Sequence, residues 1–155
     1  MTRNLGSGPL QLNPDLITRR TADIKRALQA LAGYAALSED SFLADTTILA
    51  AAKYQLLVAV GAAQGICIHL AARVAMTAPS NYADCFLLLV RPGLITQELA
   101  AKLAALAKFR NLLVHQYADV DDRRVYAIIN REVEDLEVYV AQIADFVSRA
   151  LADGS

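Results

Sequence analysis

The sequence predicts an all-α protein, an up-and-down bundle of four to five helices, on three observations. Alanine and leucine dominate the composition, while clusters of strand-forming residues bounded by turn signals are scarce. Apolar residues recur at helical spacing over long stretches. Residues that cap helices stand before these stretches, notably Asn13, Thr96 and Asp119–Asp122. We expect a flexible arm over 1–12 and one helical domain over 13–152, joined by short connections.

The first helix is expected to begin after Asn13, with Pro14 at its first position, and to run to about Leu37. Asp15 in the first turn suits the helix dipole. The basic cluster from Arg19 to Arg26 has two interpretations: a solvated helix face, or a patch for phosphate or a partner.

After a connector over 38–45, a second helix is expected from Asp45 or Thr46 to Thr77. It is apolar almost all round, which is typical of a central buried helix. Gly61 and Gly65 share a face, where they favour close helix approach either inside the monomer or at a dimer seam. His69 in this run is interpreted as a satisfied core or boundary histidine rather than a ligand.

Three further helices complete the expected bundle. A short one begins at Ser80 or Asn81 and stops before Pro92. A longer one follows Thr96, with Glu98 in its first turn. The last runs from Asp122 to about Leu151, and its apolar stripe is Val125, Ile128, Ile129, Val133, Leu136, Val140, Ile143 and Val147.

Composition restricts the possible functions. The formal net charge is −1, so any contact with nucleic acid must be a local patch or pocket. Cys67 and Cys85 lack neighbours at metal spacing and are expected to be free thiols in a reducing cytosol. No signal peptide is apparent, and the apolar run Leu56–Leu70 falls short of the roughly 20 residues that span a bilayer. We expect a soluble cytoplasmic protein with no membrane contact, no metal and no cofactor.

The stretch Arg110–Tyr117 stands out because it places charged and polar groups in an apolar helix. At about 100° per residue, Arg110 falls at the centre of the apolar stripe formed by Leu99, Leu103, Leu106, Leu113, Val114 and Tyr117. Asn111 and His115 form an i, i+4 pair about 100° to 140° away, on a side lined by alanines. A shared site therefore requires the reach of Arg110, a bend near the helix end, or a second subunit.

These residue types suit phosphodiester chemistry. Histidine exchanges protons near neutral pH, and arginine neutralises the charge that develops on a phosphate. In RNA the ribose 2′-hydroxyl is a built-in nucleophile, so cleavage there needs no metal. The alternative for Arg110 is a buried ion pair with an acidic side chain from another helix.

The residues Arg110-Asn111-Leu112-Leu113-Val114-His115-Gln116-Tyr117 match the pattern R-N-x-x-x-H-x-Y. Over roughly Asn13 to Ala150 the chain resembles the HEPN-domain proteins, most closely the HepT-like ribonuclease toxins. The resemblance implies a homodimeric HEPN-like bundle with a composite cleft at the subunit interface. It implies that Arg110 and His115 carry RNA cleavage and that Asn111 supports the active geometry.

The same resemblance implies a toxin–antitoxin system. A minimal nucleotidyltransferase antitoxin would transfer AMP to Tyr117 and silence the ribonuclease. Tyr117 also fits the simpler description of an aromatic anchor that ends the helix stripe.

Three functions remain open at this point. The first is a metal-independent endoribonuclease toxin. The second is a non-catalytic helical dimer that serves as the substrate-binding or docking partner of a nucleotidyltransferase. The third is a purely structural bundle with Arg110 in an ion pair.

Overall fold

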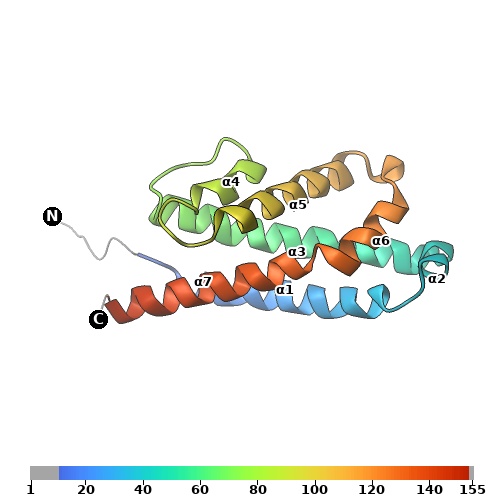
Figure 1. Ribbon diagram of the computed structural model, residues 1–155, viewed down its shortest axis with the longest axis horizontal. Helices are drawn as coiled ribbons and strands as arrows, with labels where there is room; N and C mark the ends of the chain where they lie inside the picture. The colour runs from blue at the N-terminus through green and yellow to red at the C-terminus, as the bar shows by residue number, and fades with distance from the viewer. Residues whose placement is uncertain (1–10, 154–155) are drawn as a thin grey trace.

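The structure, a computed structural model, describes residues 11–153 and confirms the all-α bundle (Figure 1). Within this range the chain contains no strand. The elements are α1 (Pro14–Ala35), α2 (Glu39–Ala44), α3 (Thr46–Arg73), α4 (Tyr82–Leu88), α5 (Gln97–His115), the 3₁₀ turn η1 (Tyr117–Asp119), α6 (Asp122–Arg131) and α7 (Glu134–Asp153). Most of the expected arm over 1–12 lies outside the described residues.

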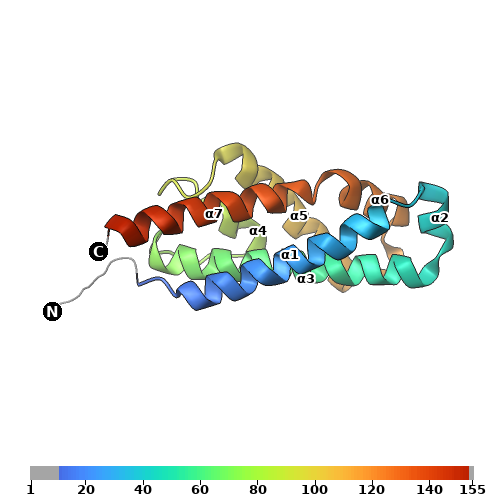
Figure 2. The same ribbon diagram turned by 90° about the horizontal axis from the view of Figure 1, so that it is seen from below.

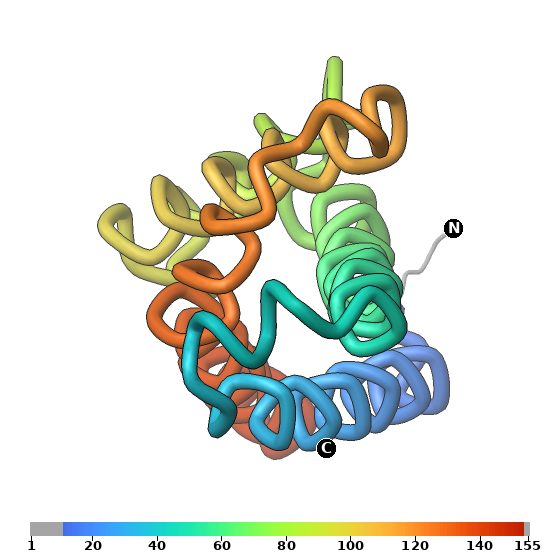
Figure 3. Tube along the Cα trace, turned by 90° about the vertical axis from the view of Figure 1, so that its right-hand side faces the viewer, coloured from blue at the N-terminus to red at the C-terminus, as the bar shows by residue number. Residues whose placement is uncertain are grey.

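The long helices α1, α3, α5 and α7 run along one axis (Figures 1 and 2). Viewed down that axis, they surround a common centre (Figure 3). One cluster of buried apolar side chains draws members from all seven α-helices. One shared core is typical of a single domain, and the bounds 13–152 stay a prediction.

Helix starts agree with the capping residues in the sequence. The Asn13 side chain accepts a hydrogen bond from the Leu16 amide at 3.1 Å, and Pro14 begins α1. The Thr96 hydroxyl accepts from the Leu99 amide at 3.3 Å at the start of α5. Each cap satisfies an amide that has no partner within its own helix.

Helix α3 is the central element, because each of the other six α-helices packs against it. By length and composition alone α3 is apolar enough to cross a membrane, so the expectation that its apolar run is too short is wrong. In the fold, 56% of its most apolar 18-residue window is buried. The core helix of a bundle has the same composition.

Three smaller predictions concern α3 and its neighbours. The Arg20 side chain of α1 lies over Gly65, 3.3 Å from where a Cβ atom at that position would stand. Gly65 therefore allows close packing inside the monomer. At Gly61 the space around such a Cβ is open. The Asn13 amide donates to His69 Nε2 at 3.0 Å, which confirms His69 as a satisfied boundary histidine. Cys67 and Cys85 are buried free thiols, and burial raises the pKa of Cys67.

The basic cluster on α1 is partly neutralised within its own helix. Asp23 pairs with Arg26 and lies 3.8 Å from Arg20. The side chains of Arg20 and Arg26 are exposed, as expected for a solvated helix face.

Several helix boundaries differ from the prediction. The connector over 38–45 contains a short helix, α2, which Ser38 caps and whose Phe42 is buried. Helix α3 ends at Arg73, before the expected Thr77. Beyond this end, the Thr77 amide bonds to the Ala71 carbonyl at 3.1 Å and holds the chain against the last turn of α3.

The single final helix expected from Asp122 to Leu151 is divided into α6 and α7. The amides of Glu132 and Val133 both bond to the Ile128 carbonyl, which closes α6. Helix α7 then starts with Glu134, Asp135 and Glu137 in its first turn, where negative charge stabilises a helix start. The apolar periodicity continues across this break and conceals it.

An ion pair ties α3 to the start of α6. Lys53 Nζ lies 2.9 Å from Asp122 Oδ1, with 8% of the lysine side chain exposed and 41% of the aspartate. The same Nζ lies 4.5 Å from the ring centroid of Tyr117, a cation–π contact. Lys53 thus fixes both ends of the segment that links α5 to α6.

The unequal burial of this pair predicts unequal mutational effects. Asp122→Asn leaves the buried Lys53 ammonium without its carboxylate, so we expect the free energy of unfolding to fall by about 1–3 kcal/mol. Lys53→Met leaves an aspartate that water can solvate and keeps the aliphatic stem, so we expect a smaller loss. Urea unfolding followed by circular dichroism measures both, and a larger loss for Lys53→Met would contradict the assignment.

Candidate functional site

The C-terminal third of α5 carries the site that the sequence predicts. Leu99, Leu103, Leu106 and Leu113 are buried, and Arg110 lies half-buried in line with them. Val114 is exposed, and Tyr117 lies outside α5, in η1. The prediction that these two residues belong to the apolar stripe of the helix is therefore wrong. The helix ends at His115, two residues before Tyr117.

One pocket of about 440 Å³ joins Arg110, Asn111 and His115. Its other lining residues are Pro79, Ser80, Asn81 and Tyr82, from the loop before α4 and the first residue of that helix. Helix α4 packs against α5, which brings this segment next to the motif. The volume lies in the range of small-molecule sites.

The pocket shows how Arg110 and His115, which lie on different sides of an ideal helix, can share one site. Arg110 and His115 point in different directions from an ideal helix, yet both border the same space, because residues 79–82 supply the facing wall. A second subunit is not needed to bring Arg110, Asn111 and His115 to one pocket.

Within the part of the chain that the structure describes, the guanidinium of Arg110 has no anionic partner. Its Nε is buried and has no hydrogen-bond partner, and no carboxylate among residues 11–153 forms an ion pair with it. The alternative of a buried ion pair is therefore wrong for the described residues. An arginine held without an anion is available to bind one, and its planar fork matches a phosphate.

Tyr117 is set apart from the other motif residues. It does not line the pocket, its ring packs on Lys53, and 44% of the residue is exposed. The structure thus brings together three of the four predicted site residues and leaves the fourth accessible beside them.

Two features of the site were absent from the sequence prediction. In the sequence, the only indication of the facing wall at 79–82 was the capping residue Asn81. Its Oδ1 accepts a hydrogen bond from the Asp84 amide at 2.9 Å. A cap indicates where a helix begins but says nothing about which surface it meets. The buried Lys53 had no signal beyond being a cation in an apolar helix.

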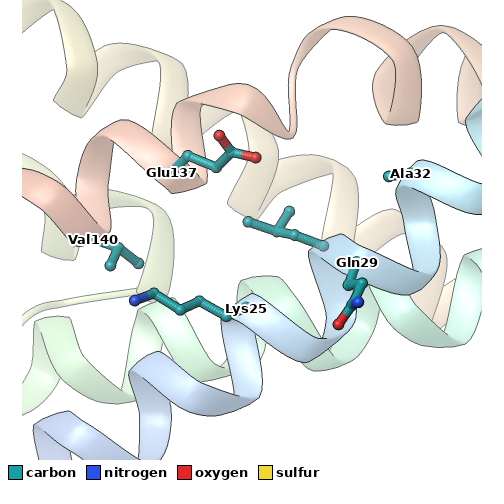
Figure 4. A pocket seen from close by; sticks show the side chains of 6 residues that line it. Lys25, Gln29, Ala32, Glu137 and Val140 are labelled. Atoms are coloured by element: carbon teal, nitrogen blue, oxygen red, sulfur yellow. The ribbon is translucent and has the colours of Figure 1, made fainter.

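A different pocket, of about 490 Å³, lies between α1 and α7 (Figure 4). Its charged residues are Lys25 on α1 and Glu137 on α7. It contains no histidine or arginine, so it offers neither the proton exchange nor the phosphate fork of the Arg110 pocket.

Comparison with known proteins identifies a family match. The family model described as "Ribonuclease HepT-like" matches residues 24–143. The tRNA nuclease HepT of Aphanizomenon flos-aquae is 26% identical over 136 residues, which are 88% of this chain and 92% of that protein. The mRNA nuclease HepT of Shewanella oneidensis is 28% identical over 130 residues, which are 81% of this chain and 94% of that protein.

Solved structures agree with these matches. The tri-AMPylated HEPN toxin of Shewanella oneidensis, solved in complex with its MNT antitoxin, superposes with a TM-score of 0.78 at 26% identity. The match covers 86% of this chain and 99% of the toxin. The cytosolic protein YutE of Bacillus subtilis shares the fold at a TM-score of 0.76 and 17% identity.

The unpartnered guanidinium predicts that Arg110 lowers the stability of the fold. Replacing it with an apolar residue of similar length, Arg110→Met, removes a half-buried charge and its orphaned Nε. We expect the free energy of unfolding to rise by about 1 kcal/mol, measured by urea unfolding.

Arg91→Met is the matched control, because Arg91 is exposed and the change should be nearly neutral. If Arg110→Met instead lowers the free energy of unfolding by more than about 1 kcal/mol, the guanidinium stabilises the fold.

Proposed function

This chain belongs to the ribonuclease HepT-like family, and from that premise we propose that it is a metal-independent endoribonuclease toxin of a toxin–antitoxin system. The chain is a ribonuclease by family. The proposal adds the site and its chemistry: Arg110 and His115 act on the scissile phosphate, Asn111 supports them, and the enzyme acts in the cytosol. The observation that carries it is the single pocket that joins these residues around an unpartnered guanidinium.

In the proposed reaction, the neutral imidazole of His115 accepts the proton of the ribose 2′-hydroxyl as its oxygen attacks phosphorus. The guanidinium of Arg110 neutralises the charge that builds on the phosphoryl oxygens. The bond to the 5′-oxygen then breaks, and that oxygen takes a proton from a water molecule, which regains one from protonated His115. The products are a 2′,3′-cyclic phosphate and a 5′-hydroxyl end.

We propose that the chain works as a homodimer. The helices that border the pocket carry other exposed large apolar side chains: Leu87 on α4, and Leu112 and Val114 on α5. Exposed apolar side chains near a site are typical of a surface that another subunit covers. The dimer would extend the cleft without supplying the motif residues themselves.

Tyr117 is the proposed acceptor of AMP from a minimal nucleotidyltransferase antitoxin. The solved HEPN toxin from Shewanella oneidensis, which is tri-AMPylated and bound to its MNT antitoxin, supports this partner class. Tyr117 lies two residues beyond His115 and is partly exposed. Its phenol oxygen would attack the α-phosphorus of ATP, with pyrophosphate as the leaving group.

The cleavage proposal predicts the behaviour of the purified protein with single-stranded RNA in EDTA. We expect the wild type to cut, and His115→Ala and Arg110→Ala each to slow cutting by about 100-fold or more. Arg110→Lys should retain part of the rate, because it keeps the charge and loses the fork. Gel analysis of end-labelled RNA measures the rate and the chemistry of the new ends.

His69→Gln is the matched control, since it removes the other histidine and should leave the rate unchanged. A substrate with 2′-deoxyribose at the cut position should resist. Cutting that needs a divalent ion, or that survives in His115→Ala, would contradict the proposal.

The modification proposal predicts one accepting tyrosine. With the antitoxin and ATP, the wild type should gain AMP on Tyr117 and lose RNA cleavage, as seen by mass spectrometry of peptides and by the gel assay. Tyr117→Phe should gain none and remain active in the presence of the antitoxin. Tyr54→Phe, which removes an exposed tyrosine on α3, should behave as the wild type.

A further inference from the structure

The wall that faces the motif residues offers one side chain free to contact a ligand. The polar atoms of Ser80 and Asn81 are used locally: the Ser80 hydroxyl lies 3.5 Å from Asp84 Oδ2, and Asn81 Nδ2 donates to the same oxygen at 2.8 Å. Asn81 Oδ1 caps the start of α4. These two residues therefore shape the wall but have little left to offer a ligand.

Tyr82 differs from its neighbours in the wall. It lines the pocket, 48% of it is exposed, and no described residue forms a hydrogen bond or ring contact with its side chain. Because about half of Tyr82 is exposed, the side chain contributes only part of its area to the core. Packing alone therefore does not explain a large aromatic side chain beside a polar site.

The chemistry opposite Tyr82 indicates what it could contact. A phosphate held by Arg110 carries a ribose and a base on each side, and the pocket of about 440 Å³ leaves room beyond the phosphate. Single-stranded RNA presents unstacked bases, which proteins hold by stacking them on Tyr, Phe, Trp or His. Paired bases in a duplex are not available for such stacking.

We propose that Tyr82 is the base-stacking residue of this site: its ring holds the nucleobase next to the scissile phosphate and selects single-stranded RNA. The proposal rests on the proposed function, because it takes Arg110 as the phosphate contact. It adds a subsite for a nucleobase and a residue that determines substrate class. Asn111 and His115 lie on the motif side of the pocket and Tyr82 on the other.

The test is binding, measured by fluorescence anisotropy with a labelled single-stranded RNA whose 2′ positions carry fluorine, so that it cannot be cut. We expect Tyr82→Ala to weaken binding by about 5- to 100-fold, the range for loss of one stacked base. Tyr82→Phe keeps the ring and should bind within about twofold of the wild type. Tyr54→Ala is the matched control, because Tyr54 is 63% exposed and lies outside the pocket.

A second oligonucleotide separates stacking from a merely structural role. It lacks the base at the position next to the scissile phosphate. If Tyr82 stacks on that base, Tyr82→Ala costs affinity for the complete RNA and almost none for the abasic RNA, as in a double-mutant cycle. Equal losses on both RNAs would assign Tyr82 a structural role and overturn the proposal.

The remaining outcomes are also decisive. Unchanged binding by Tyr82→Ala overturns the proposal, and so does an equal loss on a duplex of the same sequence. If the wild type cuts no RNA yet the base-dependent effect of Tyr82 stands, the proposed function fails and the subsite survives. If the wild type cuts RNA and Tyr82→Ala does not change RNA binding, the proposed function stands and the base subsite fails. Urea unfolding of each variant confirms that it is folded.

Discussion

The packing of every other α-helix against α3 is the constraint on which the rest of the molecule depends. A helix with so little polar surface must be covered, and the other six α-helices each take a share of it. Burial also imposes a requirement on its polar residues. Lys53 meets it by pairing with Asp122 and by lying against the Tyr117 ring, so the core helix holds the segment that follows the active motif.

The site itself is a consequence of where α5 ends. Arg110 occupies the buried side of the helix about one turn before its end, so its long side chain emerges beside the wall formed by 79–82. Packing thus holds a cation at a place where nothing in the described chain neutralises it. The local cost in stability and the capacity to bind an anion have the same physical origin.

Local signals were enough to predict the starts of α1 and α5, because a capping side chain bonds to amides only two or three residues away. They also placed Arg110 on the buried stripe, since helical periodicity is a local property. The break between α6 and α7 was missed because apolar spacing continues through it, and α2 was missed because six residues show little more than one helical turn.

The contacts that surround the candidate site could not be predicted from local sequence patterns, for a different reason. The pairing of Lys53 with Asp122 joins residues 69 positions apart, and the wall at 79–82 meets a motif 28 or more positions later. Periodicity and capping carry no information about such distant partners. The family resemblance named candidate residues, whereas only the fold shows what surrounds them.

The order of the helices along the chain has a consequence for synthesis on the ribosome. The apolar α3 emerges early, but α5, α6 and α7, which cover much of it, are made last. Until then the nascent chain carries an uncovered apolar segment that favours association with chaperones or with other chains. Asp122, which secures the motif segment through Lys53, also emerges after the motif. An unfinished chain therefore lacks the ion pair that secures the segment between α5 and α6.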